Sequence, residues 1–146
     1  MCGGVEAREA DKTWKIYFPS PKAAIPVLLE ESRQLDWIGW GRRKDEPGKG
    51  PQGGWARLNS IHAGTWERYR PRRGYAMVQR FMEKDGQPGD KTRVSHWFDV
   101  PEGAALECLV IGEGEQRRVY VVTTEPPAEY EWIHDRWPLL VVMPSA

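Results

Sequence analysis

Cysteine, long apolar runs and net charge are all scarce in this sequence of 146 residues. Two cysteines are too few for a disulfide scaffold, and no Cys-x-x-Cys pair or His/Cys cluster predicts a zinc site. The longest apolar runs, such as 139–143, have the length of a strand and exclude a membrane-spanning helix. No charged segment followed by an apolar one opens the chain, so we expect a cytoplasmic protein. We also expect a monomer without membrane partner, metal or cofactor.

What the chain does contain is enough apolar material for one domain, residues 1–146. Hydrophobic residues make up 40% of it and eight of the residues are tryptophan, which argues against disorder. A chain of this length buries about two-thirds of its unfolded surface without disulfide bonds.

Short apolar segments broken by proline and glycine dominate the secondary-structure prediction. They favour an α+β fold of curled, mainly antiparallel β-sheets that form an open barrel, with a few short flanking helices. A helix is expected from Asn59 or Ser60 to about Tyr69, and a shorter one from Pro126 or Pro127 to near Ile133. The expected strands are 13–18, 26–29, 35–40, 75–82, 93–100, 106–111, 118–124 and 139–143.

The zero net charge hides an uneven distribution along the chain. Residues 38–80 hold ten Lys and Arg against three Asp and Glu, whereas residues 81–146 hold six against twelve. Arginines interleaved with tryptophans suit a strand of nucleic acid, because they offer charge for phosphates and flat rings for bases. The alternative is a basic face that closes ion pairs within the protein.

The N-terminus offers a reactive residue, because removal of the initiator methionine would leave Cys2 first. Its α-amine has an ordinary pKa of about 7.7–8.0 and its thiol one of about 8.5, so near neutral pH part of each is nucleophilic. The amine can trap an aldehyde as a Schiff base, which the thiol closes into a five-membered thiazolidine.

Such chemistry needs groups that move protons, and two residues are candidates. His134 lies at a predicted helix-to-strand junction, and its ordinary pKa near 6.5 suits proton transfer. Glu83 follows Phe81 and Met82 at the end of an apolar strand, where burial can raise a carboxyl pKa. The alternatives are a structural, hydrogen-bonded His134 and a Glu83 that is the first exposed residue after its strand.

Four segments together resemble the SRAP family, the SOS-response-associated peptidase domain. They match in order over nearly the whole chain, and the last is the most specific. The matching segments are Met1–Gly3, Trp40–Gly41, Arg73–Glu83 (whose end, with the next residue, reads Arg80-Phe81-Met82-Glu83-Lys84), and Val122–Thr124 followed by Ile133-His134-Asp135-Arg136-Trp137-Pro138.

The resemblance implies a sensor of abasic sites in single-stranded DNA, which removes its own Met1 and joins Cys2 covalently to the ring-opened sugar. By position, Cys2 would be the nucleophile, and Glu83 and His134 would transfer protons. The resemblance also implies DNA-binding residues: phosphate ligands at Arg57 and Arg136, a matched arginine at Arg73, Thr123 lining the site, and an apolar wedge of Pro19 and Trp40.

The chain departs from the family pattern at three positions. The arginine that usually follows Cys-Gly is Gly4, and the asparagine and glutamate of an Asn-Ala-Arg-x-Glu motif are Trp55 and Asn59. Two alternatives therefore stay open: a cysteine peptidase that acts on other proteins, and a non-catalytic module that binds single-stranded nucleic acid.

Overall fold

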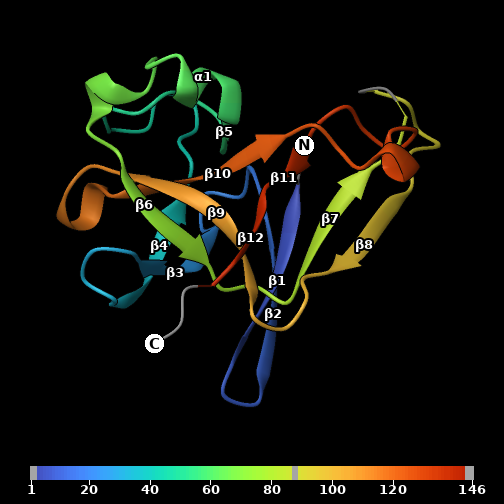
Figure 1. The fold of residues 1–146 in the computed structure, drawn as a ribbon, viewed down its shortest axis with the longest axis horizontal. Helices are drawn as coiled ribbons and strands as arrows, with labels where there is room; N and C mark the ends of the chain where they lie inside the picture. Colours follow the sequence, from blue (N-terminus) through green and yellow to red (C-terminus); the bar gives the residue numbers. More distant parts are fainter. Residues whose placement is uncertain (1–2, 87–88, 144–146) are drawn as a thin grey trace.

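The structure, a computed structural model, describes residues 3–86 and 89–143 and is mostly β. Five strands close into a barrel in the order β10-β4-β3-β6-β9 and back to β10 (Figure 1). Their bounds are β3 (Ala24–Leu29), β4 (Leu35–Trp40), β6 (Arg72–Ala76), β9 (Ala104–Ile111) and β10 (Arg118–Thr124). The predicted barrel is therefore confirmed, but it is closed where we expected an open one.

Closure depends on β10, which pairs with two barrel neighbours. It pairs antiparallel with β9 and parallel with β4, the latter through Arg118–Gly39 and Val119–Trp40. The parallel partner, β4, is far from β10 in sequence, and no local sequence pattern predicts this pairing. Three short strands extend this sheet: β5 (Trp55–Arg57) and β11 (Trp137–Pro138) on β10, and β12 (Leu140–Val142) on β9.

A second sheet of four strands lies beside the barrel in the order β2-β1-β7-β8 (Figure 1). Its strands are β1 (Gly4–Glu9), β2 (Lys12–Tyr17), β7 (Arg80–Lys84) and β8 (Ser95–Asp99), all antiparallel. Strand β1 is not among the expected strands, although the alternation of buried Val5 and Ala7 with polar residues is typical of a strand.

The segment predicted as one strand over 75–82 is two strands in different sheets. β6 pairs with β3 and β9 in the barrel, whereas β7 pairs with β1 and β8. Between them the backbone turns, with Val78 donating to the Ala76 carbonyl and Gln79 donating to Glu6 on β1. Periodicity alone did not reveal the change of sheet, because both halves are apolar.

The helices are shorter than expected. α1 covers only Leu58–His62, and Gly64, at φ +83°, turns the chain before a separate 3-10 turn, η1 (Glu67–Tyr69). Two further 3-10 turns are η2 (Gly114–Gln116) and η3 (Ala128–Tyr130). No helix of the described residues is both long and apolar enough to cross a membrane.

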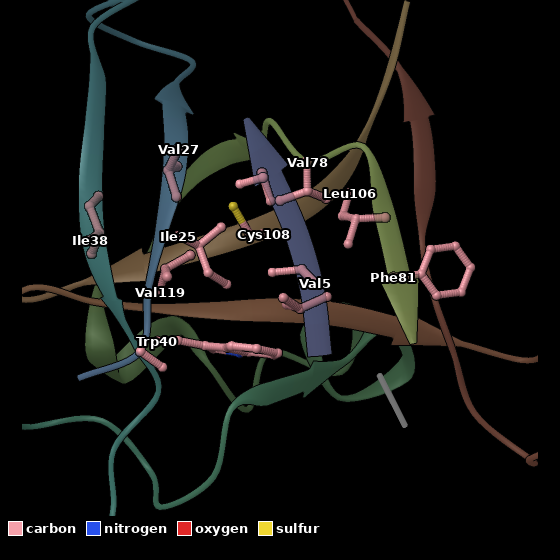
Figure 2. Close-up of a cluster of buried hydrophobic side chains, with 14 of the residues drawn as sticks. Val5, Ile25, Val27, Ile38, Trp40, Val78, Phe81, Leu106, Cys108 and Val119 are labelled. Carbon is pink, nitrogen blue, oxygen red and sulfur yellow. The ribbon is translucent and has the colours of Figure 1, made fainter. Parts of the chain in front are cut away.

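The core joins the two sheets. Figure 2 shows Val5 of β1 among barrel side chains such as Ile25 and Val119, with the ring of Trp40 below them. These residues belong to one cluster that also contains Phe81 and Trp137. Because β1 is fixed by this packing, Gly3 and Gly4 are held against β7.

Candidate functional site

A cavity of about 460 Å³ opens where β1 and β7 meet the loop after η3. Gly3, the first described residue, donates its backbone N–H to the carbonyl of Met82 at 3.0 Å. The cavity has an apolar part and a basic part, and no acidic side chain is among its described lining residues. It is lined by Gly3, Tyr17, Phe18, Trp55, Met82, Lys84, Arg93 and His134.

Glu83 lies between two of the lining residues, Met82 and Lys84, on β7. Its side chain points with that of Phe81 to the inner face of the sheet and is fully buried. Burial disfavours the charged carboxylate and raises the pKa of Glu83 to about 7. The alternative interpretation, in which Glu83 is exposed, is therefore wrong, and near neutral pH this carboxyl group can release or accept a proton.

His134 reaches the cavity from the loop between η3 and β11. Its Nδ1 accepts a hydrogen bond from the backbone N–H of Arg136 at 3.1 Å and lies 3.0 Å from Asp135 Oδ1. Burial lowers the pKa of His134, with Arg93 acting in the same direction and Asp135 opposing it. The neutral ring, with Nδ1 as acceptor, is thus the favoured form, and it can take up a proton.

The apolar wall of the cavity consists of Phe18 and Trp55. Their rings meet edge to face with centroids 4.9 Å apart, and both contact Trp40 behind them. Trp40 is fully buried, and its Nε1–H donates to the Gly54 carbonyl at 2.9 Å. The expectation that Trp40 unstacks DNA needs correction, because its ring supports the wall from inside. Pro19 is exposed beside Phe18.

Beside the cavity the structure brings two arginines together. Arg57 and Arg136 each follow a lining residue, Trp55 and His134, by two positions. Burial lowers the pKa of Arg136, and the nearby charge of Arg57 lowers it further. Arg136 is held in place by Thr123, whose carbonyl and Oγ1 accept from its Nη2 at 2.7 and 3.1 Å. Thr123 is itself fully buried, so it positions Arg136 and has no exposed surface of its own.

Arg73 is not part of this site. It lies on β6 and lines a different cavity of about 560 Å³, which shares none of the first cavity's lining residues. Its guanidinium is paired with Glu30 and Glu107, both at the surface of the barrel.

Many of the basic side chains of residues 38–80 form contacts within the protein. Arg43 donates to the carbonyls of Ser20, Trp40 and Gly41 and is paired with Glu46. Further intramolecular ion pairs join Arg72 to Glu113 and Arg80 to Glu6. For these arginines the ion-pair alternative is correct. Arg57 is different, because it is exposed and has no acidic partner among the described residues.

Cys2, the expected nucleophile, lies outside the described residues, but Gly3, to which it is bonded, lines the cavity. Sequence reasoning missed Lys84 and Arg93. Lys84 was recognisable as the basic neighbour of Glu83, whereas Arg93 enters the site only because β8 returns antiparallel to β7. No group of three or more His, Cys, Asp or Glu side chains in the described part of the chain could hold a metal ion.

Comparisons with known proteins add no relative. No family model matches the chain, and the search of curated proteins finds no match.

Proposed function

We propose that this protein captures abasic sites in single-stranded DNA as a covalent adduct on Cys2, once Met1 has been removed. The observation that carries the proposal is the position of Gly3. This residue lines one cavity with His134 and is hydrogen bonded to the residue that precedes the buried Glu83. An aminothiol attached to Gly3 would have both proton-transfer groups in its surroundings. The resemblance to the SRAP family supports the same function.

The chemistry balances without an oxidant or a cofactor. The amine of Cys2 adds to the C1′ aldehyde of the ring-opened sugar, and the resulting carbinolamine loses water to give a Schiff base. The thiol then adds to the imine carbon while its proton passes to the nitrogen, which forms the thiazolidine. The removal of Met1 is a separate hydrolysis of the Met1–Cys2 peptide bond.

The two titratable groups suit the two proton transfers. With a pKa of about 7, Glu83 is partly protonated near neutral pH and can protonate the leaving hydroxyl of the carbinolamine. The neutral form of His134 can accept the proton of the thiol. The pair Arg57 and Arg136 beside the cavity would bind the phosphates that flank the lesion.

The experiment is intact-mass analysis of the purified protein before and after incubation with a single-stranded oligonucleotide that contains one abasic site. We expect a chain without Met1 and a heat-stable adduct with the parent protein. Cys2→Ser retains an amine but loses the thiol, so it should give only a reversible Schiff base. Cys108→Ala is the matched control, because Cys108 is fully buried in the barrel and should leave adduct formation unchanged.

The same measurement separates the alternatives. A protein that cleaves added peptides without forming an adduct would be a peptidase that acts on other proteins. A protein that binds single strands and gives neither product would be a non-catalytic nucleic-acid-binding module. A stable adduct on Cys2→Ser equal to that on the parent would refute the proposed mechanism.

A further inference from the structure

The four-stranded sheet has an outer face that the proposed chemistry does not use. Val5 and Phe81 point inward to the core, so the side chains that alternate with them along the strands point outward. Strand register places these outward residues opposite one another across all four strands. The outer face consists of Glu6, Lys15, Tyr17, Arg80, Met82, Lys84, Trp97 and Asp99.

Two aromatic rings lie on this outer face. Tyr17 is 44% exposed and meets the partly exposed Trp97 edge to face, with centroids 6.3 Å apart. Gly4 lies in β1, one of the two strands between them, and is directly opposite Tyr17 and Met82. A Cβ at Gly4 would come within 3.0 Å of Tyr17 Cδ1, so glycine at this position leaves room for the ring.

Cationic side chains surround the aromatic pair. Lys15 Nζ and Arg80 Cζ lie 5.3 and 5.1 Å from the ring centroid of Trp97, within the range of cation–π contacts. Arg80 is paired with Glu6 and faces Asp99 across the strands, which offsets its charge. Lys15 and Lys84 are exposed and have no ion pair among the described residues, so both can bind an anion.

The outer face is continuous with the cavity. Tyr17, Met82 and Lys84 belong to the outer face and also line the cavity beside Gly3 and His134. If one unit of a polymer were bound in the cavity, the neighbouring units would therefore contact Trp97 and Lys15 on the outer face. The two flat rings have lysines beside them and lead away from a cavity whose described lining contains no acidic side chain. This arrangement suits a chain of bases and phosphates.

We propose that the outer face binds the stretch of single-stranded nucleic acid next to the unit held in the cavity. Bases stack on Tyr17 and Trp97, while Lys15 and Lys84 bind phosphates. Arg80 orients the Trp97 ring through its cation–π contact. The choice of nucleic acid as the polymer rests on the proposed function, but the surface is a separate binding element that needs neither Cys2 nor a lesion.

The test is the affinity of the parent protein and its variants for an intact oligothymidylate without a lesion, measured by fluorescence anisotropy at several salt concentrations. Loss of one base–aromatic stack costs about 1–3 kcal/mol, so Trp97→Ala should weaken binding by roughly 5- to 150-fold. Lys15→Ala should reduce the slope of log K against log salt by about 0.7.

Matched controls come from the opposite face of the same strand. Trp14 is 47% exposed and precedes Lys15 in β2, and Lys12 shares its side of the sheet. Trp14→Ala and Lys12→Ala should leave affinity and salt slope close to those of the parent. Thermal unfolding checks that Trp97→Ala and the conservative variant Trp97→Tyr are folded. Because tyrosine keeps a ring for stacking, Trp97→Tyr should bind the oligonucleotide with most of the parent's affinity.

The outcomes distinguish this proposal from the proposed function. If the parent forms the abasic adduct but Trp97→Ala and Lys15→Ala bind like the controls, the outer face is not the nucleic-acid surface, and a peptide partner becomes the better interpretation. If binding depends on Trp97 and Lys15 but no adduct forms, the surface is supported and the capture chemistry is refuted. A parent that does not bind the oligonucleotide would overturn the outer-face proposal.

Discussion

Glu83 on β7 lies directly opposite His96 on β8, and both side chains point to the inner face of the four-stranded sheet. His96 is itself hydrogen bonded to Asp85 at 2.8 Å, and the ring of Trp132 lies edge-on against it at 5.3 Å. The Glu83 carboxyl group is thus enclosed on a face shared with the aromatic core. This enclosure, and the pKa of about 7 that it produces, gives the site a pH dependence.

The first prediction concerns stability. The pKa of Glu83 is higher in the folded state than the ordinary 4.5, so the protonated form is the one that favours folding. This stabilisation is complete below about pH 4.5 and is lost as the pH rises through 7, at a cost of up to about 3 kcal/mol. Urea unfolding at pH 5 and pH 8 should therefore show a larger loss of stability in the parent than in Glu83→Gln.

The difference in pH dependence between the parent and Glu83→Gln measures the contribution of Glu83 alone. His134 has a lowered pKa and destabilises the fold as the pH falls, but it does so in the parent and the variant alike. Equal pH dependence in both proteins would mean that the carboxyl group of Glu83 is ionised in the fold over the whole range.

The second prediction concerns the rate of adduct formation. Glu83→Gln and His134→Gln should each slow it by about 10²–10⁴, because each variant removes one group that transfers protons. In the parent, the rate of adduct formation should fall as the pH rises above about 7, because less of Glu83 is then protonated. Single-turnover kinetics over pH 5–9 would measure this, and a Glu83→Gln profile with the same alkaline decline would contradict the assignment.

A third prediction separates binding from chemistry. Arg57 is exposed and lies beside Arg136, so Arg57→Ala should weaken binding to intact and abasic single strands alike. The salt slope should fall by about 0.7 for the lost phosphate contact. Arg33→Ala, at an exposed turn between β3 and β4, is the control. A salt titration in which both variants behave alike would remove Arg57 from the nucleic-acid surface.

The fourth prediction tests the closed barrel. Gly74 on β6 faces the interior, where an added Cβ would lie 2.7 Å from Val27 Cγ1 and 3.4 Å from Cys108 Sγ. Val27 and Cys108 are fully buried and cannot move away easily, so Gly74→Ala should destabilise the protein by about 1–3 kcal/mol. Denaturant unfolding would measure this. The control is Gly103→Ala, where nothing lies within 4 Å and the cost comes only from a backbone φ of +82°.

The β-rich class, most strand positions and the two titratable candidates could be predicted from local sequence patterns. Alternating and continuous apolar segments predict strands such as β9 and β10 because side-chain burial repeats along the chain. Glu83 was recognisable because it continues an apolar run, and His134 because it stands at a junction between elements.

Which residues contact one another could not be predicted from local sequence patterns. The parallel pairing of β4 with β10 closes the barrel, and the passage from β6 to β7 changes sheets; both join segments that no local pattern connects. Trp40 was expected at the DNA surface but lies in the core, because residues far away in sequence pack around it. Local periodicity reports only whether a position faces inward, whereas the identity of its partners follows from the packing of the whole chain.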